Sequence, residues 1–109
     1  MRTLKFIVDG KSITKDPSCD FTGLFPENNP ELRAEFIFSP EWKSRVKVVA
    51  FYSILGKEFP PQVINEEKHC QIPAEALKLP AFCMQILAID GSSIVSSDPI
   101  TIYQKGGKT

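Results

Sequence analysis

The side chains that most often perform catalysis or bind metals are few in this sequence. Histidine occurs once, at His69, directly before Cys70. Consecutive side chains of a β-strand point to opposite faces, so these two are not expected to hold one metal ion together. A cysteine–histidine pair would have to use Cys19 or Cys83 instead, and no spacing supports either. We predict that His69 is a surface or packing residue and that the protein is not an enzyme.

The cysteines show no pattern typical of a metal site or a disulfide framework. Cys19, Cys70 and Cys83 lack a C-x-x-C spacing, and their odd number in a chain without an export signal indicates free thiols. Cys70 and Cys83 fall on consecutive predicted strands, where they could be neighbours, and we interpret both as small buried residues. Cys19 lies in a predicted loop and is the best candidate for an exposed thiol.

Two further patterns match ligand sites only weakly. The segment Gly106-Gly107-Lys108-Thr109 looks like the end of a phosphate-binding loop, but that motif needs glycine where Ile102 stands and a helix after the threonine. Glu66-Glu67 could contribute to a calcium site, but no segment has the alternating oxygen ligands of a calcium loop. We therefore predict no metal site and no cofactor.

Charge and hydropathy exclude other classes of partner. Basic and acidic residues number 13 each, so there is no basic excess for a nucleic-acid backbone or an anionic membrane surface. No apolar run approaches the roughly 18 residues of a membrane span. The first apolar run, 4–8, is interrupted by Lys5 and reads as a strand rather than a signal peptide, so we expect synthesis in the cytoplasm.

The elements that must position these residues are β-strands. Apolar residues recur with a period of two almost throughout, and Asp9-Gly10 and Asp90-Gly91 are hairpin signals. A length of 109 residues fits one domain, which we place at 1–104 and expect to be followed by a disordered tail at 105–109. The one plausible helix is 73–79. The predicted strands are 3–8, 11–14, 32–38, 45–55, 58–64, 68–72, 81–89, 94–95 and 100–104.

These segments predict an all-β fold, an immunoglobulin-like antiparallel β-sandwich of seven to eight strands with one short helical turn. The segment 58–64 contains Pro60-Pro61, which cannot donate ladder hydrogen bonds, so it is an edge strand or a broken one. Trp42, just before the long strand 45–55, resembles the buried tryptophan of immunoglobulin-like cores. A small barrel is the alternative fold.

The predicted central strands 45–55 and 81–89 are apolar on both faces, whereas a two-layer sandwich buries only one face of each sheet. The second apolar face of these strands must be covered by loops such as Phe21–Phe25 or by a partner, and a large exposed apolar patch usually marks an interface. We therefore predict a protein-contact face. Its candidate residues are Val49, Phe51, Leu55, Leu87, Ile89, Phe21 and Phe25.

The most specific sequence pattern of the chain is the Cys-x-Ile-Pro-x-Glu-x-Leu run from Cys70 to Leu77. Further segments contribute to the resemblance through their order along the chain. They are Asp9-Gly10, 32–38, Ser39-Pro40-Glu41-Trp42, 46–51, 82–86 and Pro99-Ile100-Thr101-Ile102. Together they resemble immunoglobulin-like domains in tail and baseplate structural proteins of Gram-positive phages and prophages. The similarity covers nearly the whole chain by pattern. It implies a β-sandwich with an assembly role and no catalytic residues.

Three functions remain open at this point. The resemblance and the apolar surplus favour a non-catalytic structural module of a phage or prophage tail or baseplate, acting through protein–protein contacts with other phage structural proteins or with itself. The protein would then be a virion component. The alternative is a carbohydrate- or ligand-binding module at a host surface, which predicts an exposed aromatic row or a calcium loop. A small thiol enzyme is the third, and thiol titration of the folded protein would separate it from the others.

Overall fold

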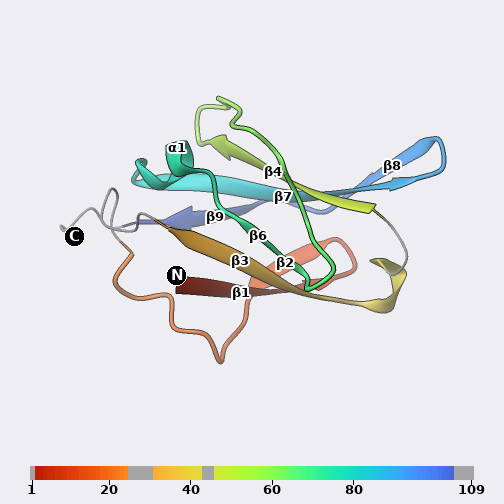
Figure 1. Ribbon diagram of the computed structural model, residues 1–109, viewed down its shortest axis with the longest axis horizontal. Helices are drawn as coiled ribbons and strands as arrows, with labels where there is room; N and C mark the ends of the chain where they lie inside the picture. The colour runs from red at the N-terminus through yellow and green to blue at the C-terminus, as the bar shows by residue number, and fades with distance from the viewer. Residues whose placement is uncertain (1, 25–30, 43–45, 105–109) are drawn as a thin grey trace.

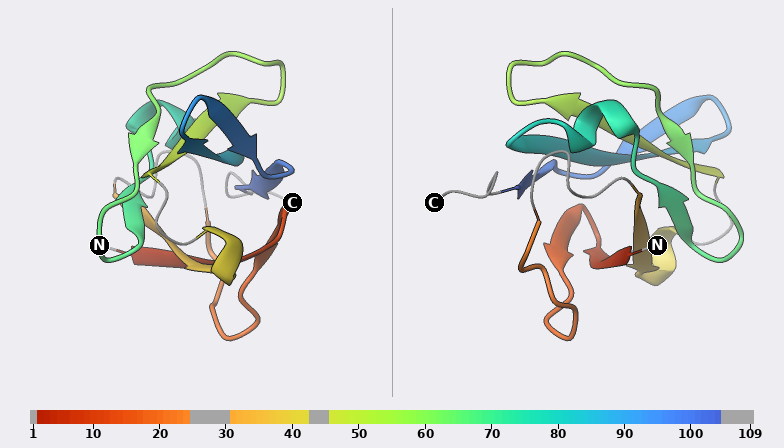
Figure 2. Two further views of the ribbon diagram at one scale, coloured as in Figure 1. Left: turned by 90° about the vertical axis from the view of Figure 1, so that its right-hand side faces the viewer. Right: turned by 60° about the vertical axis from the view of Figure 1, so that its left-hand side comes forward.

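The computed structural model describes residues 2–24, 31–42 and 46–104. Over these residues the chain forms nine strands in two sheets that pack face to face, as Figures 1 and 2 show. This confirms the predicted all-β sandwich with one short helical turn. In chain order the elements are β1 (Arg2–Asp9), β2 (Ser12–Lys15), β3 (Leu32–Phe38), η1 (Pro40–Trp42), β4 (Val46–Ser53), β5 (Gln62–Val63), β6 (His69–Gln71), α1 (Ala74–Leu77), β7 (Ala81–Asp90), β8 (Ser93–Ser96) and β9 (Ile100–Tyr103).

The first sheet has four strands in the order β2-β1-β3-β6. β1 and β2 form the predicted hairpin, and Gly10 supplies the positive φ of +61° that its turn requires. β1 and β3 run parallel, from Arg2 opposite Leu32 to Val8 opposite Phe38. The sequence predicts an antiparallel sandwich, and the parallel pairing of β1 with β3 departs from that prediction. β3 begins beside the start of β1, at Leu32 opposite Arg2, and therefore runs in the same direction.

The second sheet has the order β5-β4-β7, with β8 and β9 sharing the far edge of β7. β8 pairs with the end of β7 and β9 with its beginning. Between them the buried Ser97 exchanges hydrogen bonds with Ile86: its Oγ accepts the Ile86 N–H at 2.9 Å, and its own N–H donates to the Ile86 carbonyl at 2.9 Å. The short strand β5 follows Pro60-Pro61 and lies at an edge, as predicted.

The core lies between the two sheets and follows the period of two. In β1, Leu4, Phe6 and Val8 are buried, and the residues between them face outward. Part of the loop 16–24 folds back over this core, as predicted, because Phe21 packs edge-on against Phe6 with ring centroids 5.4 Å apart. Leu24 is buried in the same way.

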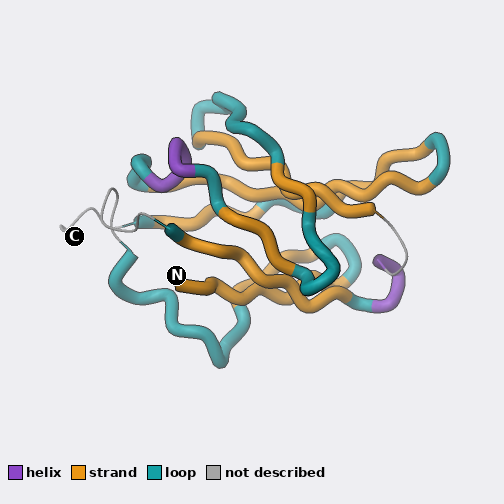
Figure 3. The backbone as a smooth tube through the Cα atoms, in the orientation of Figure 1, coloured by secondary structure: helices purple, strands orange, loops and turns teal. Residues whose placement is uncertain are grey.

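Within residues 2–24, 31–42 and 46–104, helical structure is confined to α1 and to the single turn η1, as Figure 3 shows. The helix was predicted over 73–79 and is shorter, since Pro73 has an extended ψ of 141° and precedes the first helical residue. Trp42 at the end of η1 is buried, as predicted for an immunoglobulin-like core. None of the helices among the described residues is long and apolar enough to cross a membrane.

Candidate protein-contact surfaces

Two of the residues predicted for the contact face, Val49 and Phe51, lie in the core. Their exposed fractions are 0% and 1%, and Phe51 packs against Phe82 with ring centroids 6.4 Å apart. This part of the prediction is wrong. Both faces of β4 are apolar, so the period of two separates the faces but does not show which one turns inward.

The other predicted contact residues do not form one surface. Leu55 is 96% exposed in the turn after β4, whereas Ile89 is exposed and Leu87 half-buried on the outer side of β7. Phe21 packs against the core and belongs to its covering. Phe25 lies outside the described residues.

The strands of the second sheet turn no charged side chain outward, although the exposed Glu58, between β4 and β5, is the bridge partner of the outward Tyr52. The pairing register shows which side chains turn outward, and all of them are apolar or neutral. They are Val46, Val48, Ala50, Tyr52, Val63, Ala81, Cys83, Gln85, Leu87, Ile89, Ile94, Ser96, Thr101 and Tyr103. An antiparallel sheet that faces water normally turns polar side chains outward, and an extended apolar surface usually marks an interface. We call this surface the uncharged face.

The outer side of the first sheet differs from that of the second because its strands carry charged side chains. Its outward side chains include Lys5, Asp9, Arg33 and Glu35, and Lys5 lies opposite Glu35 in the parallel register of β1 and β3. Apart from the paired Ile7 and Ile37, that sheet therefore has the ordinary alternation of an apolar inner face and a polar outer face. The lack of outward charges on the strands of the second sheet is a property of that sheet alone and does not follow from the composition of the chain.

An apolar groove of about 810 Å³ lies at one end of the second sheet. It is lined by the turn after β4, by α1 with the residues that follow the helix, and by the end of β9. The exposed Leu55 and Tyr103 both belong to its lining, and the charged side chains on it are Lys57, Glu75 and Lys78. We call this the end groove. Its volume falls within the roughly 300–1,000 Å³ of typical ligand sites.

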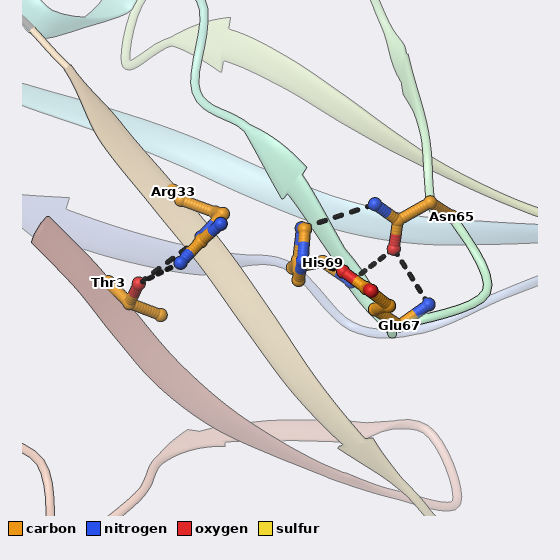
Figure 4. Close-up of polar contacts among 5 residues, drawn as sticks. All are labelled: Thr3, Arg33, Asn65, Glu67 and His69. Carbon is orange, nitrogen blue, oxygen red and sulfur yellow. Dashed lines mark hydrogen bonds and ion pairs between the residues drawn. The ribbon is translucent and has the colours of Figure 1, made fainter. Parts of the chain in front are cut away.

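The only histidine belongs to a polar cluster in the turn before β6, shown in Figure 4. The Asn65 Oδ1 accepts the backbone N–H groups of Glu67 at 2.9 Å and His69 at 3.1 Å. The amide nitrogen of Asn65 then faces the imidazole Nδ1 at 3.3 Å, and Nε2 lies 2.9 Å from a Glu67 carboxylate oxygen. Because the amide nitrogen can only donate, the neutral ring carries its hydrogen on Nε2 and donates it to Glu67.

This cluster stabilises a turn and brings no nucleophile to the imidazole. In β6, His69 lies opposite Glu35 on the outer side, whereas Cys70 lies opposite Ala34 on the inner side. The two neighbours thus point to opposite faces, as predicted. Nearby, Arg33 donates from Nε and Nη2 to the Thr3 hydroxyl at 3.2 Å (Figure 4). Across the described residues, no group of three or more His, Cys, Asp or Glu side chains is placed to hold a metal ion.

The three cysteines are free and lie apart in the fold. Cys70 is buried on the inner side of the first sheet, and burial raises the pKa of its thiol to about 12. Cys83 lies on the outer side of the second sheet, where its sulfur is 3.5 Å from the Thr101 hydroxyl. The two are therefore not neighbours, because Cys70 faces the core from the first sheet and Cys83 faces outward from the second. Cys19 is the most exposed thiol, as predicted.

Twelve of the fourteen residues of the uncharged face were missing from the predicted set, among them the apolar Val46, Val48, Val63 and Ile94. The sequence pattern that places Val46 and Val48 on this face was present, because alternation along β4 puts both side chains on one side of the strand. Val63 and Ile94 stand in strands of two and four residues, which are too short for a reliable period. Their place on this face comes only from the pairing register.

The end groove and the uncharged face offer mainly apolar contact, which suits binding. Comparison of the chain with protein-family models, with curated proteins and with solved structures found no match.

Proposed function

We propose that the protein is a non-catalytic structural module that acts through protein–protein contacts in the tail or baseplate of a phage or prophage particle. The observation that supports contact is the uncharged face. Val46, Val63, Ile89 and Ile94 are each more than half exposed there. Their removal from water by a partner would contribute about 25 cal/mol for each Å² buried.

The contrast between the two sheets supports this proposal further. A sheet whose outer side only has to be soluble carries charges, as the first sheet does at Lys5, Arg33 and Glu35. The uncharged face, which Glu58 borders beside Tyr52, has the depletion of charge that is typical of the core of a protein interface. The phage setting comes from the sequence resemblance centred on Cys70 to Leu77, because a β-sandwich alone fits many functions.

The experiment is site-specific photo-crosslinking in the cells that naturally make the protein. A photoreactive phenylalanine analogue replaces Leu87 or Ile94 on the uncharged face. The matched control carries it at Ile37, which is 54% exposed on the outer side of the first sheet. We expect adducts with defined structural proteins from positions 87 and 94 and none from 37. Equal yields at all three positions, or no adduct at the face, would contradict the proposal.

A glycan-binding module at a host surface is the competing function. The feature that favours it is Tyr103, an aromatic side chain 65% exposed at the end groove. Saturable binding of a glycan that Tyr103→Ala abolishes, together with the lack of face-specific adducts, would replace the assembly function with this one.

A further inference from the structure

The turn between β4 and β5 holds an apolar side chain out in water. Leu55 is the most exposed large apolar residue among those described, at 96%. Its turn is closed by hydrogen bonds from the Ser53 N–H to the Lys57 carbonyl at 2.8 Å and from the Gly56 N–H to the Ser53 carbonyl at 2.9 Å. The Lys57 N–H also donates to the Ser53 Oγ at 3.0 Å. Because the turn is fixed, Leu55 loses little backbone freedom when a partner covers it.

The end groove includes this leucine in its lining, which is mainly apolar. Phe59, Leu79, Pro80 and Tyr103 contribute to its lining, as does Leu55 itself. A protruding leucine and a groove that fits apolar side chains are thus parts of one surface. A partner that inserts a side chain into the groove is necessarily brought against Leu55.

This adjacency favours a second copy of the chain as the partner. When the Leu55 of one copy enters the groove of another, the groove of the first copy lies beside the Leu55 of the second. The contact is then reciprocal, with the same surface on both sides, which is the property of a two-fold interface.

The charges at the groove agree with this arrangement. Lys57 comes from the turn and Glu75 from α1, and neither takes part in an ion pair within the described residues. In the two-fold arrangement the turn of one copy lies against the helix of the other, so Lys57, two residues after Leu55, approaches the other copy's Glu75. Lys78 adds a further cation to the same helical side. Of these charges, Lys57 on the turn and Glu75 on the helix have opposite signs and can pair across a two-fold contact.

We propose that the Leu55 turn and the end groove form a two-fold contact between two copies of this chain. Each Leu55 enters the other copy's groove, and each Lys57 meets the other copy's Glu75. Of the uncharged face, this contact includes only Ala81 and Tyr103, so it goes beyond the proposed function and does not depend on the phage setting. Formal charges sum to zero at neutral pH, so long-range repulsion does not oppose it.

Sedimentation velocity over a concentration series, with reducing agent present, tests the proposal on the full chain. We expect a reversible monomer–dimer equilibrium without larger species, because a two-fold contact closes on itself. Leu55→Ser should raise the dimer dissociation constant about tenfold or more, as loss of a central apolar anchor does. The matched control, Ile37→Ser, removes an exposed apolar residue of the other sheet and should leave the constant unchanged.

A charge exchange identifies the pairing. Lys57→Glu and Glu75→Lys should each weaken the dimer, and the chain with both changes should regain most of the lost affinity. A wild-type monomer at every concentration would overturn the proposal, and so would a dimer insensitive to Leu55→Ser or a double variant weaker than both single ones. A dimer lost through Leu87→Lys but not through Leu55→Ser would move the copy contact to the uncharged face. None of these outcomes decides the proposed function, which the photo-crosslinking experiment tests separately.

Discussion

The indole nitrogen of Trp42 donates a hydrogen bond of 2.7 Å to the carbonyl oxygen of Gly10. This bond joins the turn after β3 to the tip of the β1–β2 hairpin. Trp42 is buried, and the Phe38 ring lies 6.0 Å from it between centroids. Trp42, which the sequence predicts as a core residue, therefore also links the turn of this hairpin to the segment after β3 through a hydrogen bond.

Trp42→Phe should lower the free energy of unfolding by about 1–3 kcal/mol, since it leaves the Gly10 carbonyl without its donor and reduces packing. The measurement is urea unfolding followed by far-UV circular dichroism, because the variant lacks the only tryptophan. Tyr103→Phe, which changes an exposed aromatic side chain, is the control and should stay within about 0.5 kcal/mol of wild type. Equal stability of Trp42→Phe and wild type would show that the hydrogen bond does not hold the hairpin.

The two faces of the second sheet should respond differently to truncation. Phe51→Ala removes a fully buried ring and is expected to cost about 3–5 kcal/mol of unfolding free energy. Leu87→Ala changes a half-buried side chain on the uncharged face and should cost less than about 1 kcal/mol. Thermal or urea unfolding of both variants under one set of conditions measures the difference. The reverse order would return Phe51 to the contact face on which the sequence first placed it.

The strands could be predicted from local patterns, but their partners could not. The strand 32–38 was predicted with the bounds it has, because Leu32, Ala34 and Phe36 alternate with polar residues. Its parallel pairing with β1 joins residues 30 positions apart, and a local period contains no information on such a pairing. The inward face of β4 was ambiguous because both of its faces are apolar. The end groove could not be predicted at all, since segments separated by more than 40 residues line it.

Gln104 links β9 to the end of α1. Its Nε2 donates to the carbonyls of Leu77 at 3.0 Å and Leu79 at 2.8 Å. Gln104→Glu would set a carboxyl group against two carbonyl oxygens at a buried position, so the variant's native state should favour the protonated, neutral form. The pKa of the new carboxyl would then lie above the value of about 4.3 in the unfolded chain.

A raised native pKa means that the native state binds the proton at pH values where the unfolded chain has released it, so the stability of Gln104→Glu should fall as pH rises above about 4.3. Urea unfolding at several pH values from mildly acidic to neutral measures this slope relative to wild type. Gln71→Glu, at an exposed position of β6, is the control and should show no added slope. A variant whose stability rises with pH relative to wild type would contradict the geometry of the Gln104 amide.

The thiols should react in an order set by burial. Cys19 is partly exposed and should react first with a disulfide reagent, and Cys19→Ser should remove the fast phase. Burial raises the pKa of Cys70 to about 12, so its thiol should react only on the timescale of unfolding. The native state keeps this proton when the unfolded chain loses it near pH 9.0, so stability should fall as pH rises from about 9 towards 12. A Cys70 thiol that reacts as fast as Cys19 in folded protein would revive the thiol-enzyme hypothesis.

Lys68 has a φ of +69°, the only positive value among the non-glycine residues that the structure describes. This left-handed conformation costs a residue with a Cβ atom roughly 1 kcal/mol, and glycine adopts it freely. The turn is held in place by the Lys68 N–H donating to the Asn65 carbonyl at 3.0 Å, and that bond involves the backbone only. Lys68→Gly should therefore raise the unfolding free energy by about 0.5–1 kcal/mol, with a matching rise in melting temperature. Lys5→Gly, at an exposed position in β1 without a positive φ, is the control. It should lower stability by a similar amount, since glycine weakens a strand. A decrease for both variants would show that the Lys68 side chain contributes more to the turn than its backbone conformation costs.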